Sequence, residues 1–220
     1  MIYKKIKDLV YRQLMTKLIK RNLDEAAKIK WHDIQLECIQ NHKLLLDRNS
    51  LLEVLPKKGI VAELGVDEGL FSENIIKLNN PSKLYLIDTW ETERYNQEKY
   101  IKTHSKFLTE IKEGKIEILR ESSLMAWKHF PNHYFDFVYI DTDHSYETTL
   151  QELIFWKDKI KINGFLTGHD FIQGNWNSVI KYGVIEAVYE FCVKYNWQLT
   201  YTTADYKESP SFALKRIDIK

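Results

Sequence analysis

The chain has 220 residues, of which 44% are hydrophobic, 29% charged and 13% aromatic. This composition excludes a disordered chain, a collagen and a disulfide scaffold, and no apolar run reaches the roughly 18 residues of a membrane-spanning helix. Lys and Arg number 32 against 31 Asp and Glu, so the formal charge of +1 gives no sign of a nucleic-acid partner.

The first part of the chain is basic. Residues 2–23 place apolar side chains at helical spacing with Lys and Arg between them, which predicts an amphipathic helix. Residues 1–30 hold nine basic and three acidic residues, whereas residues 31–220 hold 23 and 28. Such a helix packs on its own domain, contacts a second copy or lies on an anionic membrane, and we favour packing or a homodimer. A second helical stretch is predicted over about 29–54.

The two cysteines point to a compartment. Cys38 and Cys192 are far apart and form no CxxC motif, so we expect buried free thiols in a reducing cytoplasm. The segment after Met1 is basic and interrupted, unlike a secretory signal. We therefore expect a cytoplasmic protein.

From residue 59 onward, short apolar runs alternate with helical patterns. The predicted strands cover residues 60–64, 83–87, 116–119, 135–140 and 164–167, and the predicted helices cover about 69–78, 95–113, 123–129, 146–159 and 178–195. This alternation indicates βαβ units and a parallel sheet. Two further strands, 198–203 and 212–217, are joined by a short turn and must pair antiparallel. The prediction is a doubly wound α/β fold closed by a hairpin.

The first strand-to-helix turn carries a ligand-binding pattern. Gly65 and Gly69 allow a sharp turn and a close approach of a ligand, but their G-x-x-x-G spacing is not the dinucleotide G-x-G-x-x-G. Asp67 and Glu68 would repel a pyrophosphate at this helix N-terminus, so a cationic cofactor without phosphate fits better. Asp88 ends the second strand, 23 residues after Gly65, where nucleoside-binding folds hold ribose hydroxyls.

Two more clusters follow the fourth and fifth strands. The first reads I-D-x-D-H-S-Y-E over 140–147, and the second reads N-G-F-x-x-G-H-D-F over 163–171. Because the carboxyl ends of adjacent parallel strands share one edge of a sheet, both clusters should meet in one crevice. Carboxylate and imidazole groups therefore converge there.

These features resemble the class I S-adenosylmethionine-dependent methyltransferases, whose Rossmann-like doubly wound sheet has seven strands with the last strand antiparallel. The resemblance covers about residues 51–217, and it implies an N-terminal helical extension over 1–50 and a methyltransferase domain over 51–220. The motifs at 140–147 and 163–171, with residues 182–188, resemble a subgroup of small bacterial methyltransferases linked to sugar, capsule and natural-product modification. That subgroup is similar to macrocin-type sugar O-methyltransferases.

The resemblance also implies roles for individual residues. S-adenosylmethionine would be the cofactor, with its methionine part at Glu63 and the glycine turn, its ribose at Asp88 and its adenine at Glu121 or Ser122. The cofactor-binding residues so implied are Glu63, Gly65, Gly69, Asp88, Thr89, Ser122 and Asp141. Asp141 would lie beside the methyl-donor end.

His144 is the candidate general base, because imidazole titrates near working pH. The resemblance to catechol-type relatives, in which an ionisable base stands three residues after the acidic strand end, implies the same role, since His144 has that offset from Asp141. The alternative is that it only orients the loop. The resemblance to metal-dependent relatives makes Asp141, His169 and Asp170 a candidate site for Mg²⁺ or Mn²⁺. His169 departs from the usual oxygen ligand there, so His169 and Asp170 would otherwise contact the substrate directly.

The expected acceptor is a small polar hydroxyl compound that contains a sugar. Trp90, Tyr95 and Tyr100 either flank the cofactor or sugar or serve packing, and Trp176 is a candidate wall of the acceptor site. The alternatives are an NAD-dependent oxidoreductase, a nucleotide-sugar-modifying enzyme on a similar fold, and a non-catalytic protein that retains a cofactor pocket.

Overall fold

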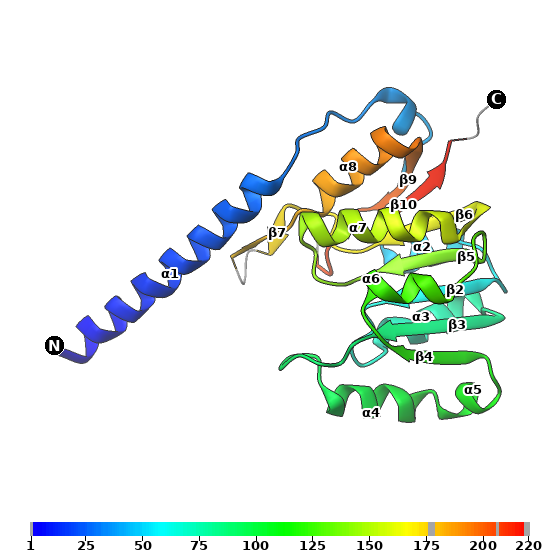
Figure 1. The fold of residues 1–220 in the computed structure, drawn as a ribbon, viewed down its shortest axis with the longest axis horizontal. Coiled ribbons are helices and arrows are strands. Elements are labelled where there is room, and N and C mark those ends of the chain that lie inside the picture. Colours follow the sequence, from blue (N-terminus) through cyan, green and yellow to red (C-terminus); the bar gives the residue numbers. More distant parts are fainter. Residues whose placement is uncertain (1, 176–178, 206, 218–220) are drawn as a thin grey trace.

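A computed structural model describes residues 2–175, 179–205 and 207–217 (Figure 1). Its centre is an eight-stranded sheet in the order β1-β9-β10-β6-β5-β2-β3-β4. The strands are β1 (Lys43–Leu45), β2 (Ile60–Leu64), β3 (Lys83–Asp88), β4 (Ile116–Arg120), β5 (Phe135–Ile140), β6 (Ile160–Gly168), β9 (Trp197–Thr203) and β10 (Phe212–Arg216). β10 pairs antiparallel with both β6 and β9, and the other pairs are parallel. The predicted doubly wound fold with an antiparallel closing strand is confirmed.

Helices cover both faces of this sheet (Figure 1). They are α2 (Arg48–Val54), α3 (Leu70–Asn79), α4 (Gln97–Lys106), α5 (Leu108–Lys112), α6 (Ser123–Ala126), α7 (Tyr146–Trp156) and α8 (Val184–Tyr195). The N-terminal helix α1 (Ile2–Lys28) instead projects away from the sheet (Figure 1). A separate small hairpin is formed by β7 (Gly174–Asn175) and β8 (Ile180–Lys181). Among the described residues, no helix is long and apolar enough to cross a membrane.

The central strands are apolar on both faces because both faces are covered. In β2, Val61 belongs to the core under α2 and α3, whereas Ala62 and Leu64 belong to the core under α6, α7 and α8. A strand buried on two sides reads as a continuous apolar run, which is why the sequence located it easily. Full burial of large side chains such as Trp156 and Phe191 contributes about 1.5–3 kcal/mol each.

The predicted helical stretch over 29–54 is wrong. Only Arg48–Val54 is α-helical, while Leu36–Cys38 form a 3-10 turn and Lys43–Leu45 pair in parallel with β9. His42 reinforces this pairing through a contact of 2.8 Å between its Nε2 and Thr202 Oγ1. Backbone pairing at the sheet edge outweighs the local helical pattern, and it supplies an eighth strand where seven were expected.

Smaller departures have local causes. The helix predicted over 95–113 is divided at Phe107, whose backbone leaves the helical region between α4 and α5. The helix predicted over 178–195 begins at Val184, because β8 occupies residues 180–181 and Gly183 caps the helix. Trp176 lies outside the described residues.

The turn after β2 depends on two left-handed glycines. Gly65 has φ of +83°, and a Cβ atom there would lie 1.9 Å from the carbonyl oxygen of Asp141. Gly69 has φ of +71°, and its Cβ would lie 2.7 Å from the Phe107 ring. Gly114 has a similar φ of +73° but open space around it. The backbone of the β2 turn is therefore packed directly against the chain that follows β5.

We expect Gly65→Ala to lower the free energy of unfolding by more than about 3 kcal/mol, because a backbone clash is added to left-handed strain. Gly114→Ala is the matched control, since it adds only the strain, about 1 kcal/mol. Urea unfolding of both variants measures the difference. Equal losses would show that the contact with Asp141 adds nothing.

Candidate active site

The loops after β2, β3, β5 and β6 meet at one edge of the sheet. The backbone ladder continues past the strand ends, with Gly65 donating to Ile87 at 2.9 Å, Asp141 to Leu64 at 2.7 Å and His169 to Ile140 at 2.9 Å. Because these strands are neighbours, the ladder places the glycine turn beside both acidic strand ends. The convergence expected from the sequence is thus present.

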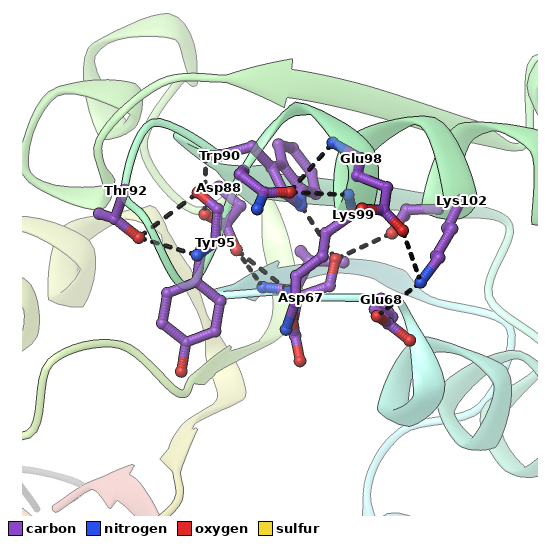
Figure 2. A network of polar contacts seen from close by, with 12 residues as sticks. Asp67, Glu68, Asp88, Trp90, Thr92, Tyr95, Glu98, Lys99 and Lys102 are labelled. Atoms are coloured by element: carbon purple, nitrogen blue, oxygen red, sulfur yellow. Dashed lines mark hydrogen bonds and ion pairs between the residues drawn. The ribbon is translucent and has the colours of Figure 1, made fainter.

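Asp88 is held by backbone amides. Its Oδ2 accepts from Val66 N at 2.9 Å and Asp67 N at 3.1 Å, and its Oδ1 accepts from Trp90 N at 3.2 Å (Figure 2). Trp90 in turn donates its indole N–H to the carbonyl of Asp67 at 2.9 Å. The Asp88 carboxylate therefore fixes the shape of the β2 turn, and Thr89 follows it as a half-buried residue.

The two carboxylates of the turn are paired. Asp67 forms an ion pair with Lys99, and Glu68 forms one with Lys102 at 3.3 Å; both lysines belong to α4 (Figure 2). The sequence predicted that the charges of Asp67 and Glu68 would repel a phosphate at this turn. Because lysines of α4 neutralise both carboxylates, this repulsion is weakened. The spacing of the glycines remains the stronger reason against a dinucleotide.

The aromatic residues after Asp88 divide into two groups. Trp90 is 2% exposed and packs edge-on against Tyr100, with ring centroids 5.4 Å apart, so both serve packing. Tyr95 is half-buried, and its phenol points away from the polar network (Figure 2). Of the three predicted aromatic candidates, Tyr95 is the one free to meet a ligand.

Glu63 lies beneath the turn and is 1% exposed. Burial raises the pKa of Glu63 to about 8, while a hydrogen bond from Ser72 and the charge of Arg48 oppose this rise. Ser122 caps α6 by accepting from Leu124 N at 3.3 Å, and Glu121 pairs with His129 at 2.7 Å on the surface. Both adenine candidates therefore have partners within the protein.

The analysis of the sequence missed Arg48. Its Nη2 lies 3.1 Å from Asp141 Oδ2, its guanidinium lies 3.8 Å from the centroid of the Phe71 ring, and its side chain is 15% exposed. Asp47 caps α2 by accepting from Ser50 N at 2.7 Å, which fixes the start of the helix that carries Arg48. The sequence D-R-N-S signals this helix start, but nothing in it points the arginine toward the crevice.

Two histidines and two aspartates form a cluster after β5 and β6. Asp170 Oδ2 lies 3.1 Å from His144 Nε2 and 3.3 Å from His169 Nδ1, and Asp141 Oδ2 lies 3.8 Å from the same His169 atom. Burial would raise the pKa of Asp170, but the hydrogen bond from His169 and the charges of both histidines hold it below its usual range. Asp170 is thus the ionised centre of the cluster.

The geometry adds His144 to the residues that could hold a metal. Ligand atoms of Asp141, His144 and Asp170 lie within 4.8 Å of one another, and this is the group of possible metal ligands in the described part of the chain. The sequence placed His169 in that group. His169 is only 9% exposed, and its Nε2 is buried without a hydrogen-bond partner.

Glu152 connects two walls of the crevice and was also missed. It accepts from Ser123 Oγ at 2.5 Å and from Thr142 Oγ1 at 2.9 Å, and so links the loops after β4 and β5. The signal was present in the sequence, because Glu152 lies on the buried stripe of α7 with Leu153 and Trp156. Burial raises the pKa of Glu152 to about 7.

A methyltransferase-domain family model matches residues 62–171 of the chain, which is half of its length. The chain belongs to this family. The protein is accordingly an S-adenosylmethionine-dependent methyltransferase, and the NAD-dependent oxidoreductase alternative is displaced. None of the curated proteins compared with the sequence matches it.

Solved structures of methyltransferases share the fold. A candidate rRNA methylase from Clostridium thermocellum is 14% identical, with a TM-score of 0.58 over 79% of this chain and 95% of that chain. A methyltransferase from Aquifex aeolicus is 16% identical, with a TM-score of 0.56 over 81% and 90%. A candidate methyltransferase from Streptococcus mutans, solved in complex with SAH, is 14% identical, with a TM-score of 0.54 over 76% and 93%. These likenesses establish the fold and leave the methyl acceptor open.

Glu152→Gln should flatten the pH dependence of stability. A Glu in the unfolded chain ionises near pH 4.5, whereas folded Glu152 keeps its proton up to about pH 7. Its contribution to stability is therefore complete below pH 4.5 and is lost as the pH rises through 7, by up to about 3 kcal/mol. Urea unfolding of wild type and variant between pH 5 and pH 8 measures the two slopes.

The matched control is Glu113→Gln, an exposed carboxylate whose removal should leave the slope unchanged. Glu63 titrates in the same direction and is present in all three proteins, so part of the slope persists in the variant. Identical slopes for wild type and Glu152→Gln would contradict the raised pKa.

Proposed function

We propose that this methyltransferase transfers its methyl group to a hydroxyl of a small polar acceptor, a sugar or a sugar-bearing intermediate. The observation that carries the proposal is the position of the imidazole of His144. It is held at 3.1 Å by the Asp170 carboxylate, in a cluster that also contains Asp141, the residue in contact with the glycine turn. An ionised carboxylate orients an imidazole and stabilises its protonated form, which is what a base for a hydroxyl requires.

The crevice fits the cofactor. Gly65 leaves no side chain over the turn, Asp88 holds the turn in shape, and Arg48 with Asp141 offers both signs of charge for an amino-acid end. We propose that Glu63, Gly65, Gly69, Asp88, Thr89, Ser122 and Asp141 line this site. When bound, S-adenosylmethionine supplies a methyl group attached to a cationic sulfur, and a hydroxyl oxygen attacks the methyl carbon in line with the carbon–sulfur bond.

In this proposal, His144 takes the proton of the acceptor hydroxyl. At the same time the hydroxyl oxygen bonds to the methyl carbon and the carbon–sulfur bond breaks. Asp170 remains ionised and holds the imidazole in place. Asp141, His144 and Asp170 are also the residues that would hold a divalent cation, which would lower the pKa of the hydroxyl. One histidine cannot ligate a metal and accept the proton through the same nitrogen, so the two roles are alternatives.

The small acceptor is favoured over a nucleic acid by charge. Residues 31–220, which contain the whole sheet, carry 23 basic and 28 acidic residues. A surface with an acidic excess does not attract a polyphosphate backbone. We infer a cytoplasmic location as well, because Cys38 and Cys192 are buried free thiols.

His144→Gln should lower kcat by about 10²- to 10⁴-fold with the Kd for S-adenosylhomocysteine unchanged, because it removes the base and leaves the cofactor site intact. The measurement is formation of S-adenosylhomocysteine with a panel of hydroxylated glycosides and nucleotide sugars. His129→Gln, an exposed histidine, is the control.

Full activity of His144→Gln would show that His144 is not the general base. Loss of wild-type turnover in EDTA, restored by Mn²⁺ or Mg²⁺, would assign His144 to the metal instead. Turnover on RNA or on an amine, with none on a hydroxyl compound, would overturn the proposed acceptor class.

The N-terminal helix presents a second feature that needs a partner. α1 leaves the body of the protein (Figure 1), and its anchored end is held where Asn22 bonds to Val179 O at 2.8 Å and accepts from Lys181 N at 3.1 Å. Several apolar side chains of α1 are each about half exposed or more: Ile6, Leu9, Val10, Tyr11, Leu14, Ile19 and Leu23.

We propose that α1 packs against a second copy of this chain. Val10 and Ile19 are nine residues apart, about two and a half helical turns, and therefore face opposite ways. A flat membrane would cover one of these faces, whereas a protein partner can enclose both. The basic excess of residues 1–30 is complementary to the acidic excess of residues 31–220. α1 would then serve assembly, and the catalytic domain would begin before residue 51, the predicted boundary, because β1 belongs to the sheet and Arg48 to the crevice.

Wild type should be a dimer by light scattering after gel filtration, and the Val10→Asp/Leu14→Asp double variant should be a monomer. Two buried carboxylates in the interface would each lose their hydration. Gln151→Asp, at an exposed position of α7, is the matched control and should stay dimeric. A monomeric wild type would contradict the proposal, and so would flotation of wild type with anionic phosphatidylglycerol vesicles.

A further inference from the structure

Arg48 is a buried cation at the edge of the proposed cofactor site. It lies outside residues 62–171, the part of the chain that matches the family model. Its guanidinium is covered by the Phe71 ring at 3.8 Å, and the Tyr139 ring centroid is 5.3 Å away. A guanidinium enclosed by aromatic rings and a carboxylate is held in one orientation, because it has little room to turn.

The hydrogen bonds of Arg48 are incomplete. A guanidinium has five N–H donors. Arg48 bonds through Nη2 to Asp141 Oδ2 at 3.1 Å, and it also has a side-chain hydrogen bond with Tyr139. Its Nε is buried and has no hydrogen-bond partner. A buried donor without a partner destabilises the protein unless a ligand satisfies it.

The charges around Arg48 match an amino-acid zwitterion. Arg48 and Asp141 present a positive and a negative group 3.1 Å apart beside the glycine turn, and the buried carboxyl of Glu63 lies close enough for the charge of Arg48 to act on it. The methionine end of the cofactor carries an ammonium and a carboxylate on one carbon atom. Its ammonium suits the carboxylate of Asp141, which leaves its carboxylate to the cation.

We propose that Arg48 binds the α-carboxylate of the cofactor's methionine end; this rests on the placement of the cofactor proposed above. A planar guanidinium presents two parallel N–H groups to a carboxylate, a geometry that a lysine cannot reproduce. Arg94 is a rival cation. It is exposed, its Cζ lies 5.0 Å from the Tyr95 ring centroid, and its charge reaches Tyr182 across the crevice.

The test is calorimetric titration with two ligands that differ only in the carboxylate: S-adenosylhomocysteine and its decarboxylated analogue, S-adenosyl-3-thiopropylamine. Wild type should bind the decarboxylated analogue about 10- to 100-fold more weakly, the range of a charged hydrogen-bonded contact. Arg48→Met should bind S-adenosylhomocysteine more weakly by the same factor, and its Kd for the analogue should stay within about twofold of the wild-type value. The Kd of Arg48→Lys for S-adenosylhomocysteine should fall between those of wild type and Arg48→Met.

Arg94→Met is the matched control and should behave as wild type with both ligands. If Arg48→Met weakens both ligands equally, Arg48 only supports Asp141 and Phe71, and the proposal is overturned. If Arg94→Met binds the two ligands equally well, Arg94 and not Arg48 contacts the carboxylate. Should Arg48→Met fail to fold, Arg48→Lys decides, because wild-type discrimination in that variant contradicts a guanidinium contact.

The result also separates this inference from the function it rests on. A wild type that binds neither ligand overturns the proposed placement of the cofactor. A wild type that binds both ligands equally retains the cofactor site and overturns only the carboxylate contact.

Discussion

The carbonyl oxygen of Asp141 lies where a side chain at position 65 would have to begin. This crowding follows from the parallel pairing of β2 with β5, which brings the two loops together as soon as the strands end. Because Gly65 has no Cβ atom, the turn lies directly on the chain that carries Asp141, His144 and their neighbours. The proposed cofactor cradle and the proposed base are thereby parts of one contact, and neither could move without the other.

The charged groups around this contact are arranged so that few remain without compensation. Asp88 accepts three backbone N–H groups, and the carboxylates of Asp67 and Glu68 are paired with lysines of α4. Glu63 and Glu152 are fully enclosed, and burial shifts both toward the protonated form. Arg48 and His169 each keep a buried nitrogen without a hydrogen-bond partner beside this contact, and in the described part of the chain Asn79, Glu186 and Arg216 have such atoms elsewhere. Incomplete hydrogen bonding therefore marks the site only together with its position at the strand ends.

The N-terminal extension is connected to the same site by a short chain of contacts. Asn22 of α1 bonds to the backbone at Val179 and Lys181, and the next residue, Tyr182, places its ring 4.9 Å from that of His144. Lys28 pairs with Glu147, the last residue of the 140–147 motif, at 3.0 Å. A partner that held α1 would therefore also hold the hairpin beside the imidazole. The proposed assembly through α1 would therefore act on the proposed base through Tyr182.

The sequence by itself determined the α/β class, the antiparallel closing strand and the positions of Gly65, Asp88 and Asp141, because buried parallel strands are continuous apolar runs and ligand loops follow their ends. Tertiary structure decided the rest. Residues 43–45 became a strand because the free edge of β9 offers backbone partners that no local pattern encodes. Arg48 reached the crevice from a segment with no motif, and both His144 and His169 came to lie beside Asp170. Such placements depend on distances across the fold, whereas a sequence pattern records only distances along the chain.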